Sequence, residues 1–415
     1  MEPYDVRVLF LNTRSDFGAD VAVHVGIACH LGGEGVDVTF TVNSQSPDAP
    51  RMSASLAGAS GLEVVRLPLG RPQAGGSLRA RLLAALCNAI MIWSFVRLVR
   101  LVRAAHVDVL HTTDRPRDAL LCTLLGAVTR RPTVVHMHSN YYPSMSRFTL
   151  WGFRHASAVV GISRFTTNSV AQAGVKPERL STIPNAVDAG YFDPARVSPG
   201  ALRAELAIPA NVPLIGLVGR FIPYKGHADL IEALALLPER LDVHVVFVGK
   251  LESGPDDYVA RLREQAAGLG LRSRIHFAGY RDPRAIYPDL DVLAVPSWEE
   301  PFGLVVAEAL AMRVPVVAYR SGGIPEIVRN SVDGLLVTPR AVDELAAALT
   351  HLIERPALRQ TLGAAGRAHV LAAFTPERQA AEVAALYQRI AAKEGHGSHA
   401  TTLSGHPTGT PGLYE

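Results

Sequence analysis

The stretch Val292-Leu-Ala-Val-Pro-Ser-Trp-Glu-Glu-Pro-Phe-Gly-Leu-Val-Val-Ala-Glu-Ala-Leu310 contains a strand, a break and a helix in direct succession. The apolar run Val292–Val295 predicts a buried β-strand, and Pro296 ends it because proline cannot donate to a strand ladder. Phe302-Gly303-Leu304 then opens an apolar helical segment. A strand followed at once by a helix is the building unit of parallel α/β sheets.

The same alternation of short apolar runs and helical segments occurs along most of the chain. Runs of this length predict two parallel sheets with helices on both faces, and such sheets bind ligands at the carboxyl ends of their strands. In the first half the expected strands are Val6–Leu11, Val36–Val42, Val107–His111, Thr133–His136 and Ala158–Ile162. In the second half they are Leu214–Val218, Val243–Val248, Ile275–Phe277, Val292–Val295, Val314–Ala318 and Gly334–Val337.

The length of 415 residues predicts more than one domain. We place an N-terminal domain at residues 1–190 and a C-terminal domain at residues 213–375. Residues 191–212, which contain several prolines, are expected to form a linker with one short helix. Residues 376–394 read as an amphipathic helix, and residues 395–415, rich in Gly, Ser, Thr, His and Pro, are expected to be disordered.

Composition limits which partners and which cellular location suit the protein. The formal net charge is only +3, so no global field favours nucleic acid as a partner. The N-terminus shows neither a basic nor an apolar signal region, and the longest apolar run, Leu82–Val96, is too short for a membrane span. The three cysteines are widely spaced and suit free thiols. A cytoplasmic location is expected.

One segment has an uneven charge distribution. No acidic residue occurs between Glu63 and Asp108, although seven arginines do. These are Arg66, Arg71, Arg79, Arg81, Arg97, Arg100 and Arg103. Residues 78–103 therefore suit an anionic membrane surface, which would place the protein peripherally at the inner face of a membrane. The alternative is an ordinary core helix.

The helix that begins near Leu304 predicts an anion site. The first amides of a helix lack intrahelical partners and its dipole favours negative charge, while Gly303 lets a phosphate approach closely. Glu300 and Glu308 flank this position, and carboxylates hydrogen-bond hydroxyls rather than phosphates. The pattern suggests a phosphate-containing ligand with two polyol ends. The alternative is a helix with solvated glutamates.

A second pattern, Gly219-Arg-Phe-Ile-Pro-Tyr-Lys225-Gly226, directly follows the expected strand Leu214–Val218. Arg220 and Lys225 would lie on a loop at the carboxyl end of that strand. Guanidinium offers a bidentate fork to phosphate and ammonium offers a compact charge. The alternative is a solvated basic turn.

Together, Gly-Arg-x4-Lys-Gly and Glu-x-Phe-Gly-x4-Glu-Ala resemble the family 4 retaining glycosyltransferases, which have the GT-B fold of two Rossmann-like domains facing across a cleft. The resemblance covers most of the chain and is stronger in the second half. Further family-like segments are Asp108–His111, Val134–His138, Ile162–Ser163, Ile183–Asp188, His276–Tyr280, Gly322–Glu326 and Asp333–Leu335.

The resemblance implies a role for each residue of the donor site. Arg220 and Lys225, on the loop that begins at Gly219, would neutralise the donor diphosphate. Backbone amides of Phe302, Gly303 and Leu304 would join them.

The sugar and nucleoside ends of the donor have their own residues by the same resemblance. Glu300 would hold the donor sugar and Glu308 the ribose, while Gly279 and Tyr280 would lie beside the nucleobase.

The first domain contributes two further positions by resemblance. His138 would lie near the reacting anomeric carbon, with a plain core or loop histidine as the alternative. The family often has Gly-Gly-Ala-Glu after its first strand, whereas this chain has Phe17-Gly-Ala-Asp20. Gly18 would still permit close approach of donor or acceptor. His111 and His136 are interpreted as strand-end residues.

The expected activity is transfer of a sugar from a nucleoside-diphosphate sugar to a hydroxyl acceptor, which is lipid-linked, a saccharide or a small molecule, with retention of anomeric configuration. No cofactor and no essential metal are expected. Asp289-Leu-Asp291 resembles the Asp-x-Asp of metal-dependent transferases, but it directly precedes a buried strand. The alternatives are a sugar phosphorylase, a nucleotide-sugar epimerase and a noncatalytic membrane-surface protein. A dinucleotide oxidoreductase is not favoured, because the full G-x-G-x-x-G turn is missing.

Overall fold

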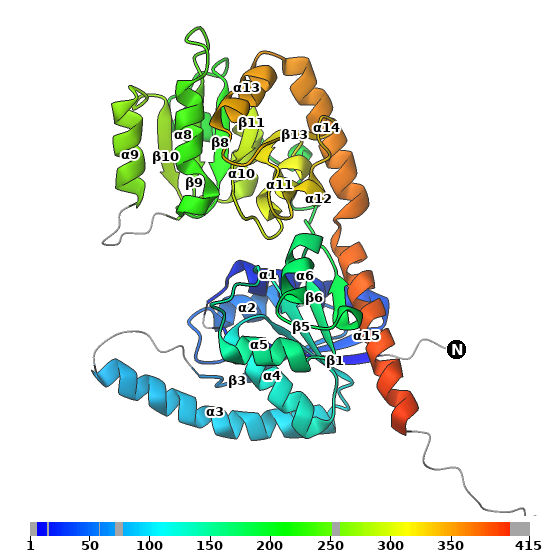
Figure 1. The fold of residues 1–415 in the computed structure, drawn as a ribbon. Helices are drawn as coiled ribbons and strands as arrows, with labels where there is room; N and C mark the ends of the chain where they lie inside the picture. The colour runs from blue at the N-terminus through cyan, green and yellow to red at the C-terminus, as the bar shows by residue number, and fades with distance from the viewer. Residues whose placement is uncertain (1–5, 15, 58, 71–77, 251–257, 399–415) are drawn as a thin grey trace, which may run out of the picture.

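The computed structural model describes residues 6–14, 16–57, 59–70, 78–250 and 258–398, and for residues 78–89 and 393–398 it describes the backbone alone. These residues form two α/β domains, one above the other in Figure 1, with a long C-terminal helical segment along both.

The N-terminal domain is built on a parallel sheet. Within the described residues seven strands pair in the order β3-β2-β1-β4-β5-β6-β7. They are β1 (Val6–Leu11), β2 (Val36–Asn43), β3 (Leu62–Leu67), β4 (Val109–Thr113), β5 (Thr133–Met137), β6 (Ala158–Gly161) and β7 (Leu180–Thr182). Strand β1 is central, with Val8 opposite Val38 on one side and Val109 on the other.

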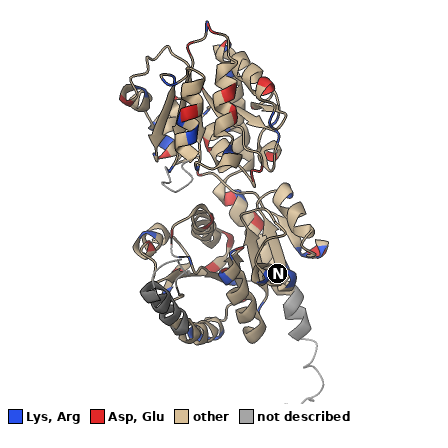
Figure 2. Ribbon diagram, turned by 60° about the vertical axis from the view of Figure 1, so that its left-hand side comes forward, with Lys and Arg blue, Asp and Glu red and all other residues tan. Residues whose placement is uncertain are grey.

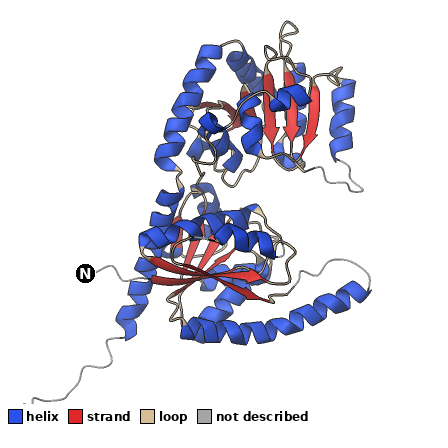
Figure 3. Ribbon diagram, turned by 180° about the vertical axis from the view of Figure 1, so that it is seen from behind, coloured by secondary structure: helices blue, strands red, loops and turns tan. Residues whose placement is uncertain are grey.

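Helices lie on both faces of this sheet, as Figure 3 shows. They are α1 (Ala19–Leu31), α2 (Ala49–Leu56), α3 (Leu78–Ala104), α4 (Pro116–Thr129), α5 (Arg147–His155) and α6 (Arg164–Ala171). Local sequence explains where several begin. Pro116 stands at the start of α4, where its fixed φ suits the first turn. The Ser163 hydroxyl accepts a hydrogen bond from the Thr166 amide and so caps α6.

The C-terminal domain repeats this plan. Six strands of the described chain pair in the order β10-β9-β8-β11-β12-β13. They are β8 (Leu214–Val218), β9 (His244–Val248), β10 (Ile275–Gly279), β11 (Val292–Val295), β12 (Val316–Tyr319) and β13 (Gly334–Val337). The longer helices are α8 (His227–Ala235), α9 (Tyr258–Gly268), α11 (Leu304–Ala311), α13 (Val342–Ile353) and α14 (Pro356–Ala373). The short ones are α7 (Ala201–Glu205), α10 (Pro283–Ile286) and α12 (Ile324–Ile327).

Short 3-10 turns connect several of these elements. They are η1 (Gly32–Glu34), η2 (Pro177–Arg179), η3 (Pro194–Arg196), η4 (Pro223–Lys225) and η5 (Tyr287–Asp289).

The last helix, α15 (Pro376–Ser398), returns to the N-terminal domain, as Figure 1 shows. Ala380, Val383 and Tyr387 are buried in the core of that domain. The Gln379 side chain donates a hydrogen bond to the Pro184 carbonyl at 2.9 Å. The helix runs four residues past the predicted end at residue 394. Residues 399–415, the rest of the predicted tail, lie outside the described residues.

The observed strands differ from the sequence prediction in two unpredicted strands and in shifts of one or two residues at several strand ends. Strands β3 and β7 were not predicted, because β3 carries Glu63 and Arg66 and β7 has only three residues. Strand β4 continues two residues past its predicted end at His111, so His111 lies in the middle of a buried strand. The prediction of His111 as a strand-end residue is therefore wrong.

Charged residues of both signs are interspersed over the two domains (Figure 2). A charged ligand therefore has to be bound by local groups and not by the field of a whole face. In the part of the chain that the structure describes, no helix has both the length and the apolar character needed to cross a bilayer.

Candidate functional site

The basic loop of the C-terminal domain lies against the end of the neighbouring strand β11. It follows β8 and turns through η4, and Gly226 then starts α8 with a φ of +75°. A β-carbon at Gly226 would overlap the Pro296 carbonyl oxygen, so only glycine fits there. The Trp298 amide donates a hydrogen bond to the Tyr224 carbonyl at 2.9 Å. These contacts bring the loop beside the segment that leads into α11.

Lys225 and Glu300 form an ion pair at this junction. The Lys225 Nζ atom lies 2.5 Å from Glu300 Oε2, and the two side chains are 15% and 10% exposed. The Glu300 carbonyl accepts a hydrogen bond from the Gly323 amide at 2.8 Å, which fixes the backbone there. The sequence-predicted cation and carboxylate therefore meet directly.

The start of α11 lies next to this ion pair. Gly303 precedes the helix with a φ of +106°, which an L-residue rarely adopts, and no side chain caps the helix. A β-carbon at Gly303 would lie 3.5 Å from Glu300 Cγ. Among the described residues the amides of Leu304 and Val305 have no carbonyl partner, whereas the Val306 and Ala307 amides donate to the Gly303 carbonyl at 2.9 and 3.3 Å. An ammonium, a carboxylate and free amides are thus assembled in one place.

Arg220 and Tyr280 are more open. The exposed Arg220 guanidinium donates a hydrogen bond to the Tyr224 hydroxyl at 3.0 Å. A β-carbon at Gly219, the preceding residue, would lie 3.7 Å from Lys225 Cδ, which is an ordinary contact distance. Tyr280 follows β10 and is 72% exposed, after Gly279 with a φ of +70°. All of these residues lie at the carboxyl ends of parallel strands, as the sequence predicted.

Glu308 has a partner that the sequence did not reveal. The Tyr287 hydroxyl donates a hydrogen bond to Glu308 Oε2 at 2.8 Å. Burial raises the pKa of Glu308 to about 7, although the Tyr287 hydrogen bond acts in the opposite direction. Tyr287 lies 21 residues earlier, and nothing in its local pattern marks it as a partner. Glu308 is therefore poised to change charge near neutral pH.

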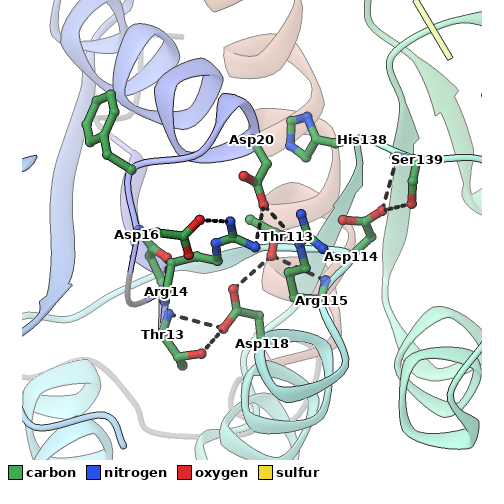
Figure 4. A network of polar contacts seen from close by, with 12 residues as sticks. Thr13, Arg14, Asp16, Asp20, Thr113, Asp114, Arg115, Asp118, His138 and Ser139 are labelled. Carbon is green, nitrogen blue, oxygen red and sulfur yellow. Dashed lines mark hydrogen bonds and ion pairs between the residues drawn. The ribbon is translucent and has the colours of Figure 1, made fainter. Parts of the chain in front are cut away.

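In the N-terminal domain, His138 lies just after β5 beside a network of charged groups (Figure 4). Asp20 pairs with Arg115 at 3.1 Å and with Arg14 at 3.7 Å. Burial alone would raise the pKa of Asp20, but the two guanidinium groups outweigh it and lower that pKa below its usual value. Burial is also the main cause that lowers the pKa of His138, and it keeps the ring neutral.

Gly18 lies at the edge of the same network. It precedes α1 with an ordinary extended backbone, so its φ does not require glycine. A β-carbon there would lie 2.8 Å from both an Arg14 nitrogen and an Asp20 oxygen, so these two side-chain ends would have to shift to admit a larger residue. The sequence did not reveal Arg14 and Arg115, because their link to Asp20 joins segments up to 95 residues apart.

The carboxyl-end loops of the two domains touch each other. The Ser163 hydroxyl donates a hydrogen bond to the Pro301 carbonyl at 2.6 Å. The Glu326 carboxylate accepts hydrogen bonds from the amides of Arg164 and Phe165 at 2.9 and 3.0 Å. The Tyr142 hydroxyl donates to Glu299 Oε2 at 3.2 Å.

The Tyr142–Glu299 contact lies close in sequence to candidate residues of both domains. Tyr142 is four residues after His138, and Glu299 immediately precedes Glu300. The candidate residues of the two domains therefore flank one interdomain contact.

The Asp-x-Asp segment is occupied by protein donors. The Asp289 carboxylate accepts a hydrogen bond from the Leu202 amide at 2.7 Å. Asp291 pairs with Arg203 at 2.8 Å and with Arg359 at 3.0 Å. Both carboxylates hold α7 and α14 onto the domain, which is a structural role.

Two family models match the chain. The model described as Glycosyltransferase Family 4 matches residues 23–191, and the model described as Glycosyl transferases group 1 matches residues 200–369. The D-inositol 3-phosphate glycosyltransferase of Corynebacterium glutamicum is 34% identical over 226 residues, which are 52% of this chain and 53% of that protein. The MMP alpha-(1->4)-mannosyltransferase of Mycolicibacterium hassiacum is 33% identical over 224 residues, 53% of this chain and 50% of that protein. The matches thus span about half the length of these relatives.

Solved structures share the fold over nearly the whole chain. Anabaena HepE in complex with UDP and glucose superposes with a TM-score of 0.73 and 26% identity, over 92% of this chain and 100% of that one. A glycosyltransferase from Rickettsia africae superposes with a TM-score of 0.76 and 20% identity, over 93% and 98% of the two chains. The predicted arrangement of two Rossmann-like domains, the GT-B fold, is therefore confirmed. With a model of the family matched in each domain, the chain belongs to the family 4 glycosyltransferases, also described as glycosyl transferases group 1.

Proposed function

We propose that the protein transfers a sugar from a nucleoside-diphosphate sugar to a hydroxyl acceptor with retention of anomeric configuration. The observation that carries this proposal is the meeting of Lys225, Glu300 and the uncapped start of α11 at one place. Related proteins support the donor class, because HepE has been solved with UDP and with UDP-glucose.

In this proposal the diphosphate lies between the basic loop and α11. Lys225 and Arg220 approach it from the loop, and the amides of Leu304 and Val305 approach it from the helix. When the bond between the anomeric carbon and the phosphate oxygen breaks, negative charge develops on the leaving nucleoside diphosphate. Fixed cations and amides stabilise that charge without reorganising, and each such donor contributes about 10²–10³-fold in rate.

The two carboxylates bind the two polyol ends of the donor. Glu300 accepts hydrogen bonds from hydroxyls of the donor sugar, beside the phosphate that Lys225 holds. Glu308 accepts hydrogen bonds from the ribose, and Gly279 with Tyr280 lies beside the nucleobase. Tyr280 is 72% exposed, so its ring is open to a ligand.

The acceptor side is assigned to the N-terminal domain. His138 would lie near the anomeric carbon, with Gly18 allowing close approach. In the retaining reaction the acceptor hydroxyl attacks from the side of the leaving group. The new bond joins the acceptor oxygen to the anomeric carbon, and a phosphate oxygen takes the acceptor proton.

We further propose that the diphosphate needs no metal ion. Arg220 and Lys225 supply the positive charge that a divalent cation supplies in other transferases. Transfer should therefore continue in excess EDTA. A complete and reversible loss of transfer in EDTA would contradict this assignment.

The test is to incubate the full chain with a panel of nucleoside-diphosphate sugars and hydroxyl acceptors, including inositol phosphate, simple saccharides and polyprenyl lipids. The expected result is release of nucleoside diphosphate that depends on one acceptor, with a product of the donor's anomeric configuration by NMR. Product formation only with inorganic phosphate would indicate a phosphorylase. A changed nucleotide sugar without any acceptor would indicate an epimerase.

A second candidate function, docking to an anionic membrane, has its own observation. On α3, Ile92 and Trp93 are 70% and 75% exposed, and Arg97, Arg100 and Arg103 are exposed further along the helix. The opposite face, with Leu98 and Val102, is buried in the domain. A helix with exposed apolar residues followed by arginines suits the interface of anionic lipids. The predicted segment 78–103 is only partly visible here, because the side chains of residues 78–89 lie outside the described residues.

The test is flotation with phosphatidylserine-containing vesicles. The change of Arg97, Arg100 and Arg103 to glutamine, or of Ile92 and Trp93 to serine, should each reduce binding. The matched control is Leu236→Ser, which removes a 59% exposed apolar side chain from the other domain. Absence of vesicle binding by the unchanged protein would exclude the idea.

A further inference from the structure

Four histidines gather in the core of the N-terminal domain. His24 comes from α1, His111 from β4, His136 from β5, and His138 follows β5. The rings of His24 and His138 are 5.0 Å apart by centroid, and those of His136 and His138 are 4.6 Å apart. Only His138 is more than slightly exposed, so the group is reached through that residue.

The hydrogen bonds available do not satisfy these rings. The Nε2 atoms of His24 and His138 lie 3.1 Å apart, close enough to share one proton. His136 is fully buried, and among the described residues neither of its ring nitrogens has a hydrogen-bond partner. A buried imidazole without partners costs on the order of 1–3 kcal/mol. The two ring nitrogens of His136 therefore lack both a hydrogen-bond partner and a bound ion among the described residues.

A divalent metal ion would give the His136 ring a partner. One nitrogen of each of His24, His136 and His138 lies within 4.8 Å of the others. Two nitrogens bound to one tetrahedral zinc ion stand roughly 3.3 Å apart, given metal–nitrogen bonds of about 2.0–2.1 Å. The 3.1 Å pair already has this spacing, and the third nitrogen would have to come closer by rotation of its ring. Three imidazoles with an open fourth position form a familiar zinc ligand set.

The surroundings favour this ligand set. His24 and His136 are 1% and 0% exposed, so their rings form a buried wall on one side of the proposed site. The carboxylates of Asp20 and Asp114 act on His138 and favour positive charge there, although Arg115 opposes them. The fourth histidine is held separately, because the Tyr387 hydroxyl lies 2.6 Å from His111 Nδ1.

We propose that His24, His136 and His138 form a zinc-type metal site in the N-terminal domain, separate from the proposed diphosphate site. The site joins α1 to β5 and leaves a fourth coordination position on the side of His138. It does not depend on the proposed transfer reaction. A metal there would occupy a nitrogen of His138. Zinc bound at this site would therefore prevent the His138 ring from acting near the sugar.

The test uses the full chain without an affinity tag. The protein is incubated with Zn²⁺, passed over a desalting column, and its metal content is measured by mass spectrometry. The key variant is His136→Phe, which keeps a buried ring but removes both unpartnered nitrogens. The matched control is His276→Gln, which breaks the His244–His276 pair at 2.9 Å in the other domain. Apart from positions 136 and 276, the histidines are the same in all three proteins.

The expected result is one more zinc ion per chain in the wild type and in His276→Gln than in His136→Phe. Equal metal content in all three proteins, or none in the wild type, would overturn the proposal. If His136→Phe fails to fold, the visible absorption spectrum of the wild type loaded with Co²⁺ tests the site instead. Intense visible bands indicate four-coordinate cobalt with nitrogen ligands and support the site, whereas the weak bands of six-coordinate cobalt oppose it.

Discussion

The ammonium of Lys225 lies 2.5 Å from the carboxylate of Glu300, although 75 residues separate them in the chain. The pair connects the basic loop after β8 to the segment before α11. In the proposed reaction these two groups bind different parts of the donor, since an ammonium binds phosphate and a carboxylate binds hydroxyls. Substitution of each should therefore have a different effect.

Lys225→Ala should reduce transfer by about 10²–10³-fold, because it removes one preorganised cation from the leaving diphosphate. It should also weaken binding of the free nucleoside diphosphate. Steady-state kinetics and calorimetric titration measure the two effects. Lys176→Ala, which removes an exposed lysine of the other domain, serves as the control and should change neither. Normal transfer by Lys225→Ala would remove this residue from the account.

Glu300→Ala should reduce transfer while the free nucleoside diphosphate still binds. The sugar loses its carboxylate partner, but Lys225 loses only a competitor for the phosphate. The measurement compares transfer rates with the affinity for nucleoside diphosphate, and Glu239→Gln, an exposed glutamate of the same domain, is the control. Loss of both properties together would mean that the wrong carboxylate has been assigned to the sugar.

Glu308 should make stability depend on pH. Its pKa is about 7 in the folded protein against 4.5 for the free side chain, so folding favours the protonated form. This contribution is fully present below pH 4.5 and is lost as pH rises through about 7. One pKa unit corresponds to about 1.4 kcal/mol, which sets an upper limit of about 3 kcal/mol.

Urea unfolding at pH 5 and pH 8 measures this effect. The wild type should lose more stability over this interval than Glu308→Gln, which cannot ionise. An equal loss in both proteins would show that the Glu308 carboxyl titrates normally.

Tyr387→Phe should destabilise the N-terminal domain by about 1–3 kcal/mol, because it removes the partner of His111 Nδ1 in a fully buried place. Tyr191→Phe is a matched control. It also removes a tyrosine hydrogen bond, at 2.7 Å to Asp282, but in an exposed position where water replaces it. Denaturant unfolding monitored by circular dichroism gives both values. A smaller loss for Tyr387→Phe than for Tyr191→Phe would contradict the buried hydrogen bond.

Gly226→Ala should destabilise the basic loop and reduce transfer together. Its φ of +75° disfavours alanine, and the new methyl group would overlap the Pro296 carbonyl. Gly268→Ala, in α9, meets no atom within 4 Å and should be neutral or slightly stabilising. Thermal unfolding and transfer assays compare the two variants. Wild-type behaviour of Gly226→Ala would mean that the loop does not have to lie against β11.

The fold and the proximity of Lys225, Glu300 and Gly303 could be predicted because both follow from local patterns. Short apolar runs predicted the central strands, and residues after them were expected at one edge of a sheet. Lys225, Glu300 and Gly303 met there for that reason. Strand β3 escaped prediction because Glu63 and Arg66 break its apolar pattern at the sheet edge.

Partners that depend on tertiary packing could not be predicted. The Tyr287–Glu308 hydrogen bond and the Arg115–Asp20 ion pair join segments without any shared sequence signal. His24 lies among apolar residues of α1, where the sequence indicates only a core-facing helix. Its approach to His138 across 114 residues depends on how α1 packs on β5.

The central claim is that a diphosphate binds between the basic loop and the start of α11. The most direct measurement is the melting temperature of the full chain in saturating UDP, GDP or ADP, for the wild type and the Arg220→Ala/Lys225→Ala double variant. A ligand that binds the folded state stabilises it by mass action. The account predicts that at least one nucleotide raises the melting temperature of the wild type and leaves the double variant nearly unchanged. No shift with any nucleotide, or an equal shift in both proteins, would contradict it.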